Sequence, residues 1–173
     1  MKLLAFSGSN SSTSINQSLV TSVASMAREN HEVDVIQLTK YNYPLYGIDL
    51  EKAEGIPATI QSLLSEFSEY DGFIISTPEH NSTIPVFFKN VLDWMSRMEG
   101  KPLEGKKVAL LSCSPGRGGA AKALAFAEKV IPYLGAEIVG TQSFSSFGEN
   151  FNDGEILNLE LKNDISNLLA KLV

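Results

Sequence analysis

The chain has 173 residues, of which 43% are hydrophobic and 20% charged, and these values suit one globular domain covering residues 1–173. Its net charge of −6 disfavours nucleic acid and anionic membrane surfaces as partners, because both attract basic proteins. The single cysteine, Cys113, excludes an internal disulfide, and without a signal-peptide core or a membrane-length apolar stretch we expect a soluble cytoplasmic protein.

Five short segments have the pattern of β-strands. Residues 3–6 are continuously apolar, residues 33–35 alternate, residues 73–75 and 108–111 are again continuously apolar, and Ile138-Val139 is a short fifth candidate. Continuous apolar runs bounded by turn residues are typical of strands buried on both faces, whereas alternation suits a strand at the edge of a sheet.

Four segments carry apolar residues at helical spacing. They cover residues 15–26, 84–98, 120–134 and 157–172, and Gly135 is placed to end the third. Strands that alternate with helices predict an α/β fold, a doubly wound five-stranded parallel sheet with helices on both faces. Right-handed crossovers, with the second strand at the edge, favour the flavodoxin-like strand order 2-1-3-4-5.

The segment 84–98 is more apolar than a helix on one sheet face needs to be. Val86 and Trp94 widen its apolar surface beyond a single stripe. We therefore expect a subunit interface here, in a homodimer or homotetramer. The alternative is a large helix that packs wholly inside its own chain.

In such a fold, ligands bind beyond the carboxyl ends of the strands, where the strand order reverses. Three loops leave those ends, at residues 7–16, 77–85 and 112–119, and all three are rich in small polar residues, glycine or proline. Their agreement is a stronger indication of a ligand site than any one loop.

The first loop reads GSNSSTSIN at residues 8–16 and contains no charged side chain. It opens a helix whose first N–H groups lack intrahelical partners and carry partial positive charge, so these groups and the hydroxyls can hold a phosphate. Because the loop has neither Gly-Lys-Ser/Thr nor GxGxxG, a monophosphate is favoured over a nucleoside triphosphate. The alternative is that Ser12 or Ser14 merely caps the helix, and this loop alone does not separate the two.

The other two loops carry no convincing catalytic or metal-binding constellation. His80 has no second histidine beside it, so neither a metal site nor a Ser-His-Asp triad is expected. Arg117 is the only cation in the three loops and could meet a second phosphate, as in a nicotinamide dinucleotide, or could be an exposed arginine in a flexible turn. The aromatic loop 144–151 could cover a substrate or a partner, although ordinary packing is preferred.

Four stretches together resemble the NADPH-dependent FMN reductase family, which includes flavodoxin-like quinone, chromate and azo-dye reductases. They are GSNSSTSIN, PLYGIDLE at 44–51, TPEHNSTIPVFFKNVLDW at 77–94 and SPGRGGA at 114–120. The family's first loop has the form GSxRxxSxN, and its second has PEYNxxxP followed by a helix with Lys-Asn and Asp-Trp. The chain departs from this pattern at Ser11, where arginine is usual, and at His80, where tyrosine is usual.

The resemblance implies FMN as cofactor and NADPH or NADH as co-substrate. It places the phosphate at the first loop and the flavin ring along the second and third loops, with these binding residues: Ser9, Ser11, Ser14, Ile15, Asn16, Pro78, Glu79, His80, Asn81, Ser114, Pro115, Gly116, Arg117, Gly118 and Gly119. The implied activity passes electrons from NAD(P)H through the flavin to a quinone, an azo compound, a metal oxyanion or free flavin. The alternatives are a flavodoxin-type electron carrier and a non-catalytic flavin-binding module.

Overall fold

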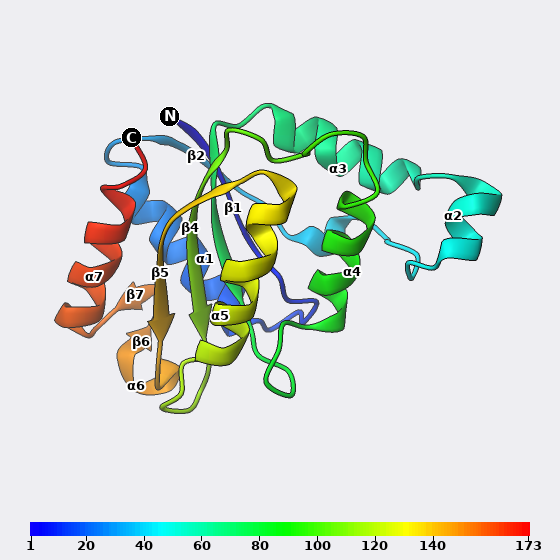
Figure 1. Ribbon diagram of the computed structural model, residues 1–173. Coiled ribbons are helices and arrows are strands. Elements are labelled where there is room, and N and C mark those ends of the chain that lie inside the picture. The colour runs from blue at the N-terminus through cyan, green and yellow to red at the C-terminus, as the bar shows by residue number, and fades with distance from the viewer.

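The computed structural model describes all residues, 1–173, and its centre is a five-stranded parallel sheet (Figure 1). The strands are β1 (Lys2–Ser7), β2 (Glu32–Val35), β3 (Gly72–Thr77), β4 (Lys107–Cys113) and β5 (Glu137–Phe144). They lie in the order β2-β1-β3-β4-β5, with every neighbouring pair parallel. The predicted flavodoxin-like order is therefore confirmed, with β2 at one edge.

Helices cover both faces of the sheet (Figure 1). One face is covered by α1 (Ile15–Ala27) and α7 (Leu159–Leu169), and the other by α3 (Ala58–Ser68), α4 (Val86–Met95) and α5 (Ala121–Val130). Successive residues of β1 enter opposite cores, since Leu3 packs with the α1 and α7 side and Leu4 with the α3, α4 and α5 side. This is why the middle of a central strand is a continuous apolar run.

Several predicted elements have different ends in the structure. The fifth strand is eight residues long. Its second half was not predicted, because it contains the polar Thr-Gln-Ser stretch and so is not an apolar run. The helix predicted for 120–134 ends at Val130 and continues as a 3₁₀ turn, η2 (Ile131–Leu134), because Pro132 has no N–H to donate. Gly135 ends this turn with φ of 99°, as expected of a glycine cap.

Other elements were not predicted. They are η1 (Leu38–Lys40), α2 (Ile48–Glu54), α3, α6 (Phe147–Asn150) and a small antiparallel hairpin of β6 (Phe151–Asn152) and β7 (Glu155–Ile156). Helix α2 buries none of its residues and projects from the body of the molecule (Figure 1). In the aromatic loop, Phe144 is fully buried and the rings of Phe147 and Phe151 stack 4.5 Å apart, which is ordinary packing.

Helix α4 satisfies most of its apolar surface within the chain. Phe88, Val91, Leu92, Trp94 and Met95 are all buried against the rest of the molecule, and Val86 is 74% exposed. The apolar character of α4 is thus explained without a second subunit, and the oligomeric state stays a prediction. No helix has both the length and the apolar character needed to cross a membrane.

Candidate functional site

Strands β1, β3 and β4 lie side by side, so the loops that follow them emerge at one edge of the sheet (Figure 1). This edge contains every residue predicted to bind the cofactor. The structure brings the three loops together as predicted, while binding by their residues stays a prediction.

Asn16 joins the three loops from beneath. Its side-chain amide donates to the carbonyl of Cys113 (3.1 Å), and its carbonyl oxygen accepts from the backbone N–H of Cys113 (3.0 Å) and from the hydroxyl of Ser76 (2.7 Å). The residue is only 1% exposed. Asn16 therefore fixes the ends of β3 and β4 against the start of α1, and this geometry favours a positioning role over direct contact with a ligand.

In the first loop, the backbone folds onto its own hydroxyl groups. The hydroxyl oxygens of Ser7, Ser9 and Ser11 accept from the backbone N–H groups of residues 9, 11 and 13, at 3.2, 3.2 and 3.3 Å. Of these three hydroxyls, that of Ser9 keeps its O–H free to donate to a ligand, because Ser7 is buried and the Ser11 hydroxyl lies 3.4 Å from that of Thr13. The backbone N–H groups at 12, 14 and 15 make no hydrogen bond within the chain. The loop thus presents donors and no acidic group to an anion.

Ser14 performs the capping role that was the alternative for this loop. Its hydroxyl oxygen accepts from the backbone N–H of Gln17 at 3.2 Å, which satisfies one unpaired donor at the start of α1. The cap leaves the hydroxyl hydrogen of Ser14 free. Capping and anion binding are therefore compatible at this residue, and the two interpretations of the loop no longer exclude each other.

The second loop ends in a tight turn. The backbones of His80 and Thr83 exchange hydrogen bonds of 2.9 and 3.2 Å, and the two residues between them, Asn81 and Ser82, have positive φ angles of 52° and 68°. Residues 80–82 are exposed, so their side chains face solvent at the edge of the site. Glu79 instead turns toward α5, where its carboxylate accepts from the backbone N–H groups of Lys122 (3.1 Å) and Ala123 (3.2 Å).

The third loop is fixed at its end and open in its middle. The carbonyl of Gly119 accepts from the hydroxyls of Ser112 (2.7 Å) and Ser143 (3.0 Å), and a Cβ at Gly119 would come within 2.1 Å of the Ser143 oxygen. Residues 115–118 are exposed, and Cβ atoms at Gly116 and Gly118 would meet nothing within 4 Å. Arg117 is exposed and has no ion pair, so a ligand could reach both the open backbone and the guanidinium.

Four supporting residues were missed in the sequence. Ser76 and Ser112 are polar residues at the ends of apolar strands, and this break in the apolar pattern could have identified them. Ser143 lay in the unpredicted half of β5, and in the sequence Lys122 is an ordinary helix residue.

Cys113 is 1% exposed, and burial raises the pKa of its thiol to about 12, so it is an inert thiol rather than a nucleophile.

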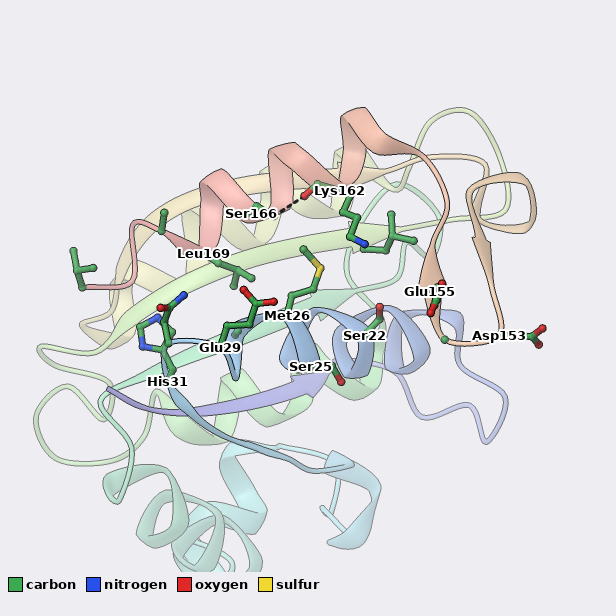
Figure 2. A pocket seen from close by; sticks show the side chains of 16 residues that line it. Ser22, Ser25, Met26, Glu29, His31, Asp153, Glu155, Lys162, Ser166 and Leu169 are labelled. Atoms are coloured by element: carbon green, nitrogen blue, oxygen red, sulfur yellow. Dashed lines mark hydrogen bonds between the residues drawn. The ribbon is translucent and has the colours of Figure 1, made fainter.

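A groove of about 940 Å³ lies away from this edge, between α1, the β6–β7 hairpin and α7 (Figure 2). Its apolar floor includes Met26 and Leu169, and its rim is mostly polar. His31 lines one end, and burial together with the N-terminal ammonium lowers its pKa, which favours the neutral ring. Ser25 and Ser166 donate to carbonyls of their own helices, so neither hydroxyl bonds across the groove.

Comparison with known proteins gives consistent matches. A family model described as NADPH-dependent FMN reductase matches residues 1–150. A quinone reductase of Escherichia coli (strain K12) is 30% identical over 144 residues, covering 83% of this chain and 76% of that protein. An NAD(P)H-dependent FMN reductase of Pseudomonas aeruginosa is 28% identical over 134 residues, covering 78% and 71%. A solved flavoenzyme, an NAD(P)H:(acceptor) oxidoreductase of Paracoccus denitrificans, has the same fold, with a TM-score of 0.82 at 23% identity, covering 99% of this chain and 96% of that one.

Proposed function

Because the chain belongs to the NADPH-dependent FMN reductase family, and is thus an NAD(P)H-dependent, quinone reductase-like enzyme, we propose that its three loops bind one FMN. The observation that carries this proposal is the convergence of the loops on one edge, with unpaired donors in the first and open glycine backbone in the third. The resemblance drawn from the loop sequences is confirmed at the level of the family.

The donor set of the first loop suits a phosphate monoester. Unpaired N–H groups and outward hydroxyls surround the start of α1, and the loop has no carboxylate to repel a dianion. The loop also has no lysine or arginine, so dipoles rather than formal charge would hold the phosphate. We therefore expect weaker FMN binding than in a family member with arginine at the position of Ser11.

The other two loops would hold the ring. Pro78 stiffens the second loop, and the open Gly116 to Gly118 backbone allows a flat ring to approach the third loop closely. When bound, FMN supplies the redox chemistry, which is hydride transfer from NAD(P)H and electron transfer to a second acceptor at the same site. Because the cofactor would supply the chemistry, the site needs no acid–base or nucleophile constellation of its own.

Arg117 is the proposed contact for a phosphate of the nicotinamide co-substrate. It is exposed and unpaired, in the middle of the open third loop.

The proposed electron acceptor is a quinone, an azo compound, a metal oxyanion or free flavin. We also propose that the chain self-associates through residues 84–98, and the exposed side chain of Val86 supports this. Sedimentation of the purified protein tests the self-association.

The function is tested by titrating the purified protein with FMN and then adding NADPH, and separately NADH, without oxygen. We expect saturable FMN binding, loss of the oxidised flavin absorption on adding the nucleotide, and its return on adding a quinone. Flavin that binds but is reduced by neither nucleotide would favour the electron carrier. Absence of FMN binding would overturn the proposal.

A further inference from the structure

The second loop supplies a cap to the helix that follows the third loop. The carboxylate oxygen Oε2 of Glu79 accepts from two successive backbone N–H groups at the start of α5, those of Lys122 and Ala123. Glu79 is separated from these residues by 43 and 44 positions in the chain. The contact is therefore tertiary, and it ties the second loop to the start of the helix that follows the third loop.

Helix α5 has no cap of its own. The residue before it, Ala120, makes no side-chain hydrogen bond to the helix and has a left-handed conformation with φ of 61°, which alanine rarely adopts. An unfavourable backbone conformation persists where surrounding contacts fix it. The two bonds to Glu79 supply such contacts at the point where the third loop enters the helix.

A second contact reinforces the first. The ammonium of Lys122 lies 3.3 Å from the hydroxyl of Ser82, at the tip of the exposed turn in the second loop. Lys122 thus meets the second loop through both its backbone and its side chain. The turn, Glu79 and the start of α5 form one connected unit at the edge of the candidate site.

We propose that Glu79 is a positioning residue for the flavin, acting through the start of α5 rather than by its side chain touching the cofactor. It holds the second and third loops in a single arrangement, and its negative charge offsets the positive end of α5. This inference rests on the proposed FMN site. The Glu79 side chain thus has two effects on the site, one on the arrangement of the loops and one on its electrostatics, and substitutions can separate them.

Two substitutions separate the two roles. Glu79→Ala removes both the acceptor and the charge, whereas Glu79→Gln keeps an acceptor oxygen and removes the charge alone. Glu128→Gln is the control, because Glu128 is an exposed carboxylate on α5, the helix that Glu79 caps, and makes no hydrogen bond or ion pair. Any general effect of removing one negative charge from the protein appears in this control.

The first measurement is amide hydrogen exchange of the FMN-free proteins. We expect faster exchange at residues 122 and 123 in Glu79→Ala, and exchange close to wild type in Glu79→Gln and Glu128→Gln. The second is FMN binding by fluorescence, where we expect Glu79→Ala to raise Kd about five- to tenfold, as for loss of a helix cap. Glu79→Gln should raise it less than threefold, since the amide still caps the helix.

The third measurement is the midpoint potential of the bound flavin. Removing a negative charge near the ring favours the electron-rich reduced form, so we expect a more positive potential in Glu79→Gln and no shift in Glu128→Gln. A purely structural cap would leave the potential of Glu79→Gln unchanged, and that result would overturn the electrostatic role. Unchanged FMN affinity in Glu79→Ala would overturn the positioning role, whether or not exchange increases. Failure of wild-type protein to bind FMN would instead overturn the proposed function and this inference with it.

Discussion

The loop edge of the sheet and the groove between α1 and α7 are both polar surfaces, yet they are organised in different ways. At the loop edge, buried groups from distant parts of the chain bond to one another, with the Asn16 side chain linked to the hydroxyl of Ser76 and the backbone of Cys113. In the groove, Ser25 and Ser166 bond only within their own helices, although its volume is about 940 Å³. The comparison teaches that convergence of fixed polar groups, rather than hollow space, marks the candidate site.

The strongest test of this contrast is Asn16→Ala. The change leaves the hydroxyl of Ser76 and the backbone of Cys113 unpaired in the interior, so we expect a loss of about 3 kcal/mol in the free energy of unfolding. Asn10→Ala is the matched control in the same loop, because Asn10 is exposed and makes no hydrogen bond. Denaturant unfolding measures the stability of both variants. Equal stabilities would show that the hydrogen bonds of Asn16 do not hold the loop edge together.

A second test compares neighbouring glycines in the third loop. Gly119→Ala places a methyl group 2.1 Å from the Ser143 oxygen at a φ of +57°, so we expect a loss of about 2 kcal/mol in the free energy of unfolding. Gly118→Ala meets nothing within 4 Å, and we expect it to stay within about 0.5 kcal/mol of wild type. Thermal unfolding of the two variants distinguishes a loop fixed at one end from a loop that is flexible throughout.

A third test adds charge to the loop edge. Ser11→Arg introduces the side chain that the family usually has at this position, and we expect FMN to bind about tenfold more tightly through a charge-assisted contact. Ser12→Arg adds the same charge one residue away and controls for general attraction of the phosphate dianion. Titration at low and high salt measures both affinities, and equal gains would show that position within the loop is unimportant.

The smallest expected effect lies in the groove. The pKa of His31 is lowered in the folded protein, so protonation opposes folding there. The stabilising contribution of neutral His31 is fully present above its ordinary pKa, about 6.5, and is lost as pH falls through the folded value. We expect His31→Gln to flatten the fall in stability between about pH 7 and pH 5 slightly and to leave FMN affinity unchanged. A marked change in FMN affinity would show that the groove takes part in the site.

Some elements of the fold could be predicted from the sequence, and others could not. The strand order and the three loops were predictable because central strands leave continuous apolar runs and polar loops necessarily follow them. Helix α3 was missed although Ile60, Leu63 and Phe67 carry its buried spacing, whereas α2 buries nothing and leaves no such pattern. The contact of Glu79 with α5 was beyond prediction, because a carboxylate capping a helix more than 40 residues away leaves no local signal.

The position of Cys113 gives the protein an internal reporter. It is the only thiol in the chain, it is 1% exposed, and both its backbone N–H and its carbonyl bond to Asn16 beneath the loops. Its side chain packs in the core beneath α1 and α7, so a thiol-modifying reagent can react only with molecules in which this core has transiently opened. The labelling rate then measures how often the core next to the loops opens, and a cofactor that stabilises the folded form should slow it.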